Sequence, residues 1–246
     1  EKIRLLKQLQ TKYPSSSLIA DANMEIAQAY LSDESFSEAL PYLNAVLNDK
    51  RSEALKPRAY LRAGLAYYNL GNNEAALKQY SSLLEQYPNS SEAEDALDNA
   101  RSIYVEEGRT SEYIAYARQM GRDVSTNQQD SLAYAAAEVQ LSNGNFTNAI
   151  ERFNTYLNNY PNGRYIIEAN YYKGEIHLSR KEFAEAAKSY EEVASRVPNK
   201  FGEKSLLQAA RLNFFDLKDY EKAAQLYARL KEFASTEENK LEAMRG

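Results

Sequence analysis

Apolar and small residues recur three and four positions apart between Pro57 and Pro88, the spacing that places them on one face of a helix. Two such faces occur, separated by a turn at Leu70-Gly71-Asn72. The second face ends before Pro88, because proline disfavours helical geometry at the residue that precedes it. The stretch therefore predicts a hairpin of two antiparallel helices. The expected contact positions are Tyr60, Ala63, Gly64 and Tyr67 in the first helix and Ala76, Tyr80, Leu83 and Leu84 in the second.

The same hairpin recurs along the chain in steps of 36 or 37 residues. The position where we expect the two helices to cross is filled in order by Ala39, Ala76, Tyr113, Ala149, Ala186 and Ala223. The position four residues later, on the same helical face, is filled by Leu43, Tyr80, Ala117, Phe153, Tyr190 and Tyr227. This register predicts six stacked hairpins, because a hairpin covers its apolar face only by packing against a neighbour.

The third hairpin, residues 94–127, departs from the pattern. Tyr113 is large where the other hairpins have alanine, and Ala117 is small where most have an aromatic side chain. The two positions lie one turn apart on one helical face, so the exchange roughly conserves volume, which cores tolerate well. We interpret the segment as a repeat with compensated packing. A linker between two separate arrays is the alternative.

Both ends of the chain have the pattern of incomplete repeats. Residues 2–13, followed by Pro14, have the character of the second helix of a hairpin. Leu241-Glu242-Ala243-Met244 has the character of the opening of a further hairpin. We therefore expect residues 1–246 to form a single solenoid that is a fragment of a longer array.

Composition narrows the class of function. A net charge of -5 argues against a nucleic-acid binder, which usually carries a basic face. The absence of cysteine removes disulfides, thiolate metal sites and cysteine nucleophiles, and it is compatible with either the cytoplasm or an oxidising envelope compartment. No apolar run is long enough to span a membrane, so we expect no direct membrane insertion by these residues.

No catalytic or cofactor motif can be assembled from the sequence. The single histidine, His177, occupies a position that aromatic residues fill in most other hairpins, so we expect a half-buried packing residue. The adjacent acidic pairs Glu106-Glu107 and Glu191-Glu192 point to different helix faces, which favours a solvated surface. A glycine-rich phosphate loop and a nucleophile elbow are both missing. We predict a protein that is not an enzyme and has no cofactor and no metal.

These repeats resemble the tetratricopeptide repeat family, most strongly around Gly64–Pro88, Ala137–Pro161 and Gly174–Pro198. Family repeats are usually about 34 residues long, and the extra length here follows a Tyr-Pro ending such as Tyr87-Pro88-Asn89-Ser90. That ending resembles bacterial cell-envelope members, namely the Tol-Pal system coordinator and the outer-membrane assembly lipoprotein. The resemblance implies an all-α, right-handed α-α superhelix of about six helical hairpins plus truncated end repeats.

The resemblance also implies a concave groove lined by the first helix of each hairpin. Transferred position by position, the groove residues are Arg58, Leu61, Arg62, Leu65, Tyr68, Tyr134, Glu138, Leu141, Tyr171, Glu175, Leu178, Leu212 and Phe215. Aromatic and aliphatic side chains with a few charges suit an extended peptide or an amphipathic helix. Packing of these residues against neighbouring hairpins is the alternative. The Lys and Asn with which chaperone-binding members hold a peptide carboxylate are replaced here by Leu61, Leu65, Tyr134 and Glu138.

The sequence thus favours a non-enzymatic scaffold for protein–protein interaction that binds a peptide or helix in its groove. The resemblance implies a periplasmic or outer-membrane-associated location. A cytosolic assembly or regulatory scaffold of the same fold is the alternative, and a non-catalytic part of a larger enzyme is a third interpretation.

We expect added bulk at Ala149 and Ala186 to destabilise the fold. Each is a position where two helices are predicted to cross closely, so Ala→Leu should overpack the core and lower the free energy of unfolding by roughly 1–3 kcal/mol. Leucine is nearly as good a helix former as alanine, so a loss would report on packing. Thermal unfolding followed by circular dichroism checks this. Unchanged melting temperatures in both variants would show that the register is wrong.

Overall fold

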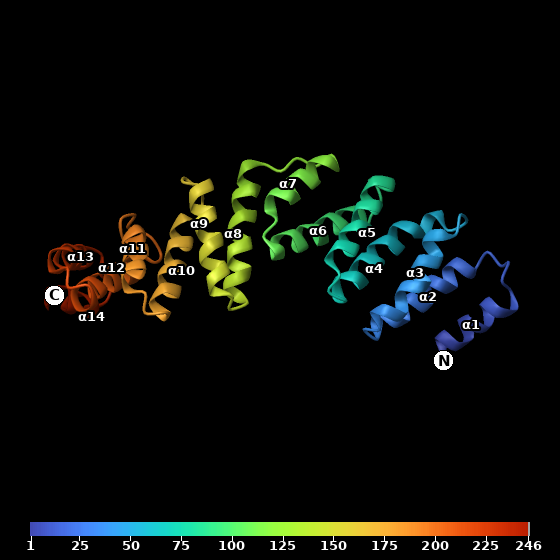
Figure 1. Cartoon of the computed structure of the whole chain (residues 1–246), viewed down its shortest axis with the longest axis horizontal. Helices are drawn as coiled ribbons and strands as arrows, with labels where there is room; N and C mark the ends of the chain where they lie inside the picture. Colours follow the sequence, from blue (N-terminus) through green and yellow to red (C-terminus); the bar gives the residue numbers. More distant parts are fainter. Residues whose placement is uncertain (246) are drawn as a thin grey trace. The chain divides into compact units, whose positions relative to one another are not determined.

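The computed structural model describes residues 1–245, and within that range the chain forms helices and turns with no β-strand (Figure 1). The all-α prediction is confirmed. The chain divides into two compact units, Glu1–Val124 and Ser125–Gly246, called here the N-terminal and C-terminal units. Each is a stack of antiparallel helical hairpins, consistent with the predicted α-α solenoid.

The N-terminal unit begins with one helix and continues as three hairpins. Each hairpin pairs two consecutive helices, and α3 contacts α4 as α5 contacts α6, so successive hairpins pack on one another. The elements are α1 (Lys2–Lys12), α2 (Ile19–Ser32), α3 (Phe36–Asn48), a 3₁₀ turn η1 (Glu53–Leu55), α4 (Lys56–Asn69), α5 (Asn73–Gln86), α6 (Ala93–Glu107) and α7 (Thr110–Gln119).

The C-terminal unit contains three further hairpins and a closing helix. The last of these hairpins, which is the sixth along the chain, differs from the others because its first helix, α12, continues into a π-helical segment. The elements are α8 (Thr126–Ser142), α9 (Phe146–Asn159), α10 (Ile166–Ser179), α11 (Phe183–Ala194), α12 (Gly202–Arg211), the π-helix η2 (Leu212–Asp216), α13 (Tyr220–Phe233) and α14 (Glu237–Arg245).

The predicted register is confirmed by burial. All twelve positions of the two series that begin at Ala39 and Leu43 are buried, and none is more than 6% exposed. Both series lie on the second helix of each hairpin, which explains the spacing of four residues. The apolar pattern read from the sequence is therefore the pattern of the core.

The third hairpin is formed by α6 and α7. The Tyr113 ring contacts Tyr104 on α6 with centroids 6.2 Å apart, and Ala117 is fully buried one turn later. The segment is thus a helical hairpin rather than an extended linker. The division between the two compact units follows it, between Val124 and Ser125. A single solenoid over residues 1–246 stays a prediction.

The turns inside the hairpins share one backbone geometry. In each, one residue adopts a positive φ of 54° to 73°, and these residues keep the repeat spacing: Glu34, Gly71, Gly108, Gly144, Lys181 and Lys218. Glycine adopts this left-handed conformation without a steric penalty, whereas the other side chains adopt it at a cost. The hairpin therefore imposes the turn geometry, and glycine is the residue that adopts it with the smallest steric cost.

The crossing of the two helices depends on a small residue opposite a large ring. A Cβ atom added at Gly64 on α4 would overlap the ring of Tyr80 on α5. Gly174 on α10 faces Tyr190 on α11 in the same way, with the added Cβ 2.8 Å from the ring. Both tyrosines are fully buried, so neither ring can turn into solvent.

We expect Gly64→Ala to destabilise the N-terminal unit. Overpacking costs roughly 1–3 kcal/mol, while alanine returns about 1 kcal/mol of helix propensity, so the net change should be a lower melting temperature. The matched variant Gly174→Ala has the milder overlap and should lose less. Thermal unfolding of both variants checks the order. A Gly64→Ala protein that melts above the wild type would show that the crossing is not this tight.

Candidate functional site

The groove residues predicted for the N-terminal unit all lie on α4 and form the α4 face, defined as Arg58, Leu61, Arg62, Leu65 and Tyr68. Arg58 is exposed and the other four are half-buried. Residues 58 and 62, like 61 and 65, are four apart, so the face has a basic row beside an apolar row.

The two ends of the α4 face contact the next hairpin. The Tyr68 hydroxyl donates a hydrogen bond to Glu106 Oε1 on α6 at 2.8 Å. Arg58 Nε lies 3.8 Å from Glu92 Oε1, a long ion pair. The alternative of inter-hairpin packing therefore describes part of this face, and the middle of the face stays accessible.

Arg62 is the unusual member. Within residues 1–245 it makes no hydrogen bond and no ion pair. Burial lowers the pKa of its guanidinium, the positive charge of Arg58 lowers it further, and the carboxylate of Glu25 opposes these effects. The half-buried positive charge thus lacks a direct counter-charge.

The groove tyrosines predicted for the C-terminal unit lie between hairpins. Tyr134 is 6% exposed and stacks on Tyr165, with centroids 4.4 Å apart and an interplanar angle of 11°. Tyr171 is 7% exposed and stacks on Phe201, with centroids 3.9 Å apart and an angle of 7°. Each ring is covered by an aromatic residue that precedes the next first helix. At these two positions the expectation of open aromatic anchors is therefore corrected in favour of packing.

Charged neighbours of these tyrosines belong to the same packing. Glu175 is half-buried and accepts hydrogen bonds from the Tyr190 hydroxyl at 2.6 Å and from Lys204 Nζ at 3.1 Å. Glu138 is exposed and lies 3.5 Å from the Tyr134 hydroxyl, so it is the more accessible acidic residue.

The aliphatic groove residues divide in the same way. Leu141 and Leu178 are half-buried and pack against the cores of their own hairpins. Leu212 is only 3% exposed. Phe215, which lies on the same π-helical segment, is 66% exposed and is the most open large apolar side chain among the described residues. Of the predicted groove aromatics, Phe215 is the most exposed, and Tyr68 is half-buried.

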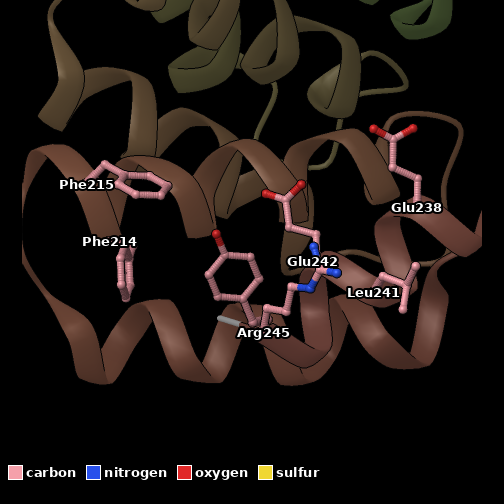
Figure 2. A pocket seen from close by; sticks show the side chains of 7 residues that line it. Phe214, Phe215, Glu238, Leu241, Glu242 and Arg245 are labelled. Carbon is pink, nitrogen blue, oxygen red and sulfur yellow. The ribbon is translucent and has the colours of Figure 1, made fainter.

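Phe215 borders a cavity of about 420 Å³ between η2, α13 and α14. Figure 2 shows Phe214 and Phe215 on one side of it and Leu241, Glu242 and Arg245 on the other. The lining residues are Phe214, Phe215, Tyr227, Glu238, Leu241, Glu242 and Arg245. The volume falls in the range of small-ligand and side-chain pockets. We call this the Phe215 cavity.

The charges at the Phe215 cavity are partly neutralised. Arg211 donates from Nε and from a terminal nitrogen to the two carboxylate oxygens of Glu242, both at 2.5 Å. This bidentate contact holds the pKa of Glu242 below its usual range and ties α14 to α12. Glu238 and Arg245 are exposed and carry opposite charges. The cavity therefore has an aromatic wall and a polar rim with little net charge.

The cavity lies beside the π-helical segment η2, which supplies Phe214 and Phe215 to its lining. A π turn contains an extra residue and recurs at functional sites. Phe214 and Phe215 follow each other on η2 and contact in an edge-on geometry with centroids 4.9 Å apart. Sequence reasoning selected Phe215 and missed Glu238 and Arg245. The available signal was the pair of adjacent aromatics at the end of a first helix.

His177 is half-buried as expected, and its Nδ1 lies 2.5 Å from Glu182 Oε2 in the following turn. Across residues 1–245 no group of three His, Cys, Asp or Glu side chains could hold a metal ion. None of the helices described is both long enough and apolar enough to cross a membrane.

Comparison with known proteins supports the repeat assignment. Two tetratricopeptide repeat models match residues 58–90 and 134–200, which together make up less than half of the chain. No curated protein matches the chain. These two segments match tetratricopeptide repeats, and the repeat register read from the sequence passes through both of them.

Solved structures overlap the chain only loosely. PilF from Pseudomonas aeruginosa is 17% identical, with 92% of this chain and 96% of that chain covered and a TM-score of 0.38. A tetratricopeptide repeat protein from Parabacteroides merdae is 15% identical, with coverages of 92% and 97% and a TM-score of 0.40. YrrB, described as a TPR protein with an unusual peptide-binding site, is 15% identical, with coverages of 83% and 98% and a TM-score of 0.37.

Replacing a buried aromatic residue with alanine should destabilise the protein more than replacing an exposed one. Tyr134→Ala removes a ring from the core and should lower the free energy of unfolding by about 3–5 kcal/mol, as large-to-small core changes do. Phe215→Ala removes an exposed ring and should change it by about 0.5 kcal/mol or less. Chemical denaturation of the two variants measures the difference. Equal losses would mean that Phe215 is packed in solution.

Proposed function

We propose that the protein is a non-enzymatic scaffold that binds a protein partner through its first-helix surface, with the Phe215 cavity receiving an apolar side chain of a peptide or helix. The tetratricopeptide repeats support a role in protein–protein interaction. The proposal that the cavity receives an apolar side chain rests on one observation, namely that Phe215 is 66% exposed beside a cavity of about 420 Å³.

The chemistry of the Phe215 cavity supports this choice. Large, poorly covered aromatic groups next to a pocket are typical anchors of protein interfaces, where a few buried rings carry most of the affinity. The polar rim formed by Glu238 and Arg245 can stay hydrated around an apolar centre, which is the usual anatomy of an interface. Nothing in the lining supplies an activated nucleophile or an acid–base pair, so the proposal involves recognition without chemistry.

We also propose a periplasmic or outer-membrane-associated location. Its support is the Tyr-Pro ending with an extended approach to the next hairpin, seen at Tyr87-Pro88 and Tyr160-Pro161. Fractionation of the cells that make the protein tests it. Recovery in the cytosolic fraction alone would favour the cytosolic scaffold of the same fold.

Phe215→Ala should weaken peptide binding while the fold persists. Peptides selected from a random library displayed on phage and panned on the wild-type protein provide the probe. An anchor aromatic typically contributes about 2 kcal/mol, which is roughly thirtyfold in affinity. Fluorescence anisotropy of the selected peptides measures the change.

The control is Phe146→Ala, because Phe146 is a 39% exposed phenylalanine at the start of α9 and does not line the cavity. Its binding should equal that of the wild type. If Phe215→Ala binds the selected peptides as tightly as the wild type, the cavity is not the binding site. If no peptide is enriched at all, the scaffold proposal itself loses its support.

A further inference from the structure

We infer that the α4 face selects a partner segment that carries carboxylate groups beside apolar side chains, with Arg62 as the main charged contact. The inference rests on the proposed function, because it names the chemistry of the partner that the first-helix surface of the N-terminal unit would take.

The first argument is the unpaired charge of Arg62. Its guanidinium is half-buried and makes no hydrogen bond or ion pair within residues 1–245. Partial burial of a charge without a partner is unfavourable, and the fall in the pKa of Arg62 shows that its surroundings disfavour the positive form. A carboxylate brought to this position would restore the lost solvation.

The second argument is the state of the nearby acids. Glu25, the carboxylate whose field reaches Arg62, accepts a hydrogen bond from Lys2 Nζ at 2.5 Å. Glu92 lies beside Arg58 rather than Arg62, at 3.8 Å. Glu106 accepts hydrogen bonds from the Tyr68 hydroxyl at 2.8 and 3.0 Å. Within residues 1–245 no carboxylate therefore forms an ion pair with Arg62, and Arg58 adds a second positive charge one turn away.

The third argument is the apolar row beside these charges. Leu61 and Leu65 are half-buried and lie one turn apart, next to the row formed by Arg58 and Arg62. A segment with carboxylates on one side and apolar side chains on the other matches both rows. Arginine suits this contact because its planar guanidinium can donate two parallel hydrogen bonds to one carboxylate.

A phosphate group could meet the same guanidinium, so nucleic acid is the competing partner. The apolar row favours a peptide, since a phosphate backbone offers nothing to cover Leu61 and Leu65. The net charge of -5 also opposes a polyanion with a charge at every residue. We therefore argue for an acidic peptide segment and treat nucleic acid as an outcome of the test.

The experiment pans a phage-displayed random peptide library on the full chain and measures the affinities of the enriched peptides at two salt concentrations. Peptides of this class should be enriched in Asp or Glu beside Leu, Ile or aromatic residues. Arg62→Gln should weaken their binding roughly tenfold, as expected for one charge-assisted contact. Arg62→Lys keeps the charge and should retain part of the affinity. Binding to wild type should fall with added salt.

The matched control is Arg118→Gln, which removes the same charge from α7, a second helix of the same compact unit, where Arg118 is exposed. It should leave binding unchanged. A double-mutant cycle tests whether the two groups are in contact. Replacing the peptide's acidic residue with its amide should weaken binding to the wild-type protein. The same replacement should have little further effect on binding to the Arg62→Gln variant. Additive losses would place the carboxylate elsewhere and overturn the inference.

Removal of the charge should not destabilise the chain on its own. Arg62→Gln should melt at or above the temperature of the wild type, because a half-buried unpaired charge is lost. A lower melting temperature would show that Arg62 makes a stabilising contact in the free protein, and the inference would fail.

The remaining outcomes separate this inference from the proposed function. Enriched peptides that depend on Phe215 and lack acidic residues would overturn the inference and leave the scaffold proposal intact. Enrichment of no peptide would overturn both. Tight binding of a single-stranded oligonucleotide that is lost in Arg62→Gln would assign the face to nucleic acid and overturn the peptide inference.

Discussion

The close crossing of the two helices in each hairpin is the constraint on which the rest of the structure depends. Gly64 lies against Tyr80, and Gly174 lies against Tyr190, so the helices approach as nearly as the ring allows. The buried positions of the second helices recur in steps of 36 or 37 residues, so within each unit successive hairpins pack through equivalent positions. The left-handed residue in each turn follows from this geometry, since lysine or glutamate accepts it where glycine is absent.

Stacking of the hairpins decides which side chains a partner can reach. Tyr134 and Tyr171 point from first helices, yet an aromatic residue of the following segment covers each ring. A tyrosine ring that stacks on a neighbouring ring stabilises the fold through the same kind of contact that could hold a ligand. A ring used in this way is not available to a partner. The proposed recognition surfaces are therefore positions that no neighbouring ring covers, such as Phe215. Phe215 is 66% exposed on the π-helical segment, and within residues 1–245 Arg62 makes no hydrogen bond and no ion pair.

The two surfaces differ in their chemistry. The Phe215 cavity is aromatic, and the contact between Arg211 and Glu242 neutralises part of its rim. The α4 face has two arginines beside two leucines. Apolar cavities contribute affinity, whereas a charged face contributes specificity and the rate of association. The two surfaces belong to different compact units, so each is considered as a separate recognition surface.

The sequence by itself determined the repeat. The 36- and 37-residue step, the alanine at five of the six crossing positions and the burial of both registers follow from helical periodicity, which is a local property. It also located the first-helix positions from which a groove would be built. Only the tertiary structure decided which of them are open, because the exposure of Tyr134 or Phe215 depends on a residue in the next segment and on its rotamer. The Phe215 cavity likewise required α14 to pack against α13, so that residues of η2, α13 and α14 line one space, and no local pattern encodes that arrangement.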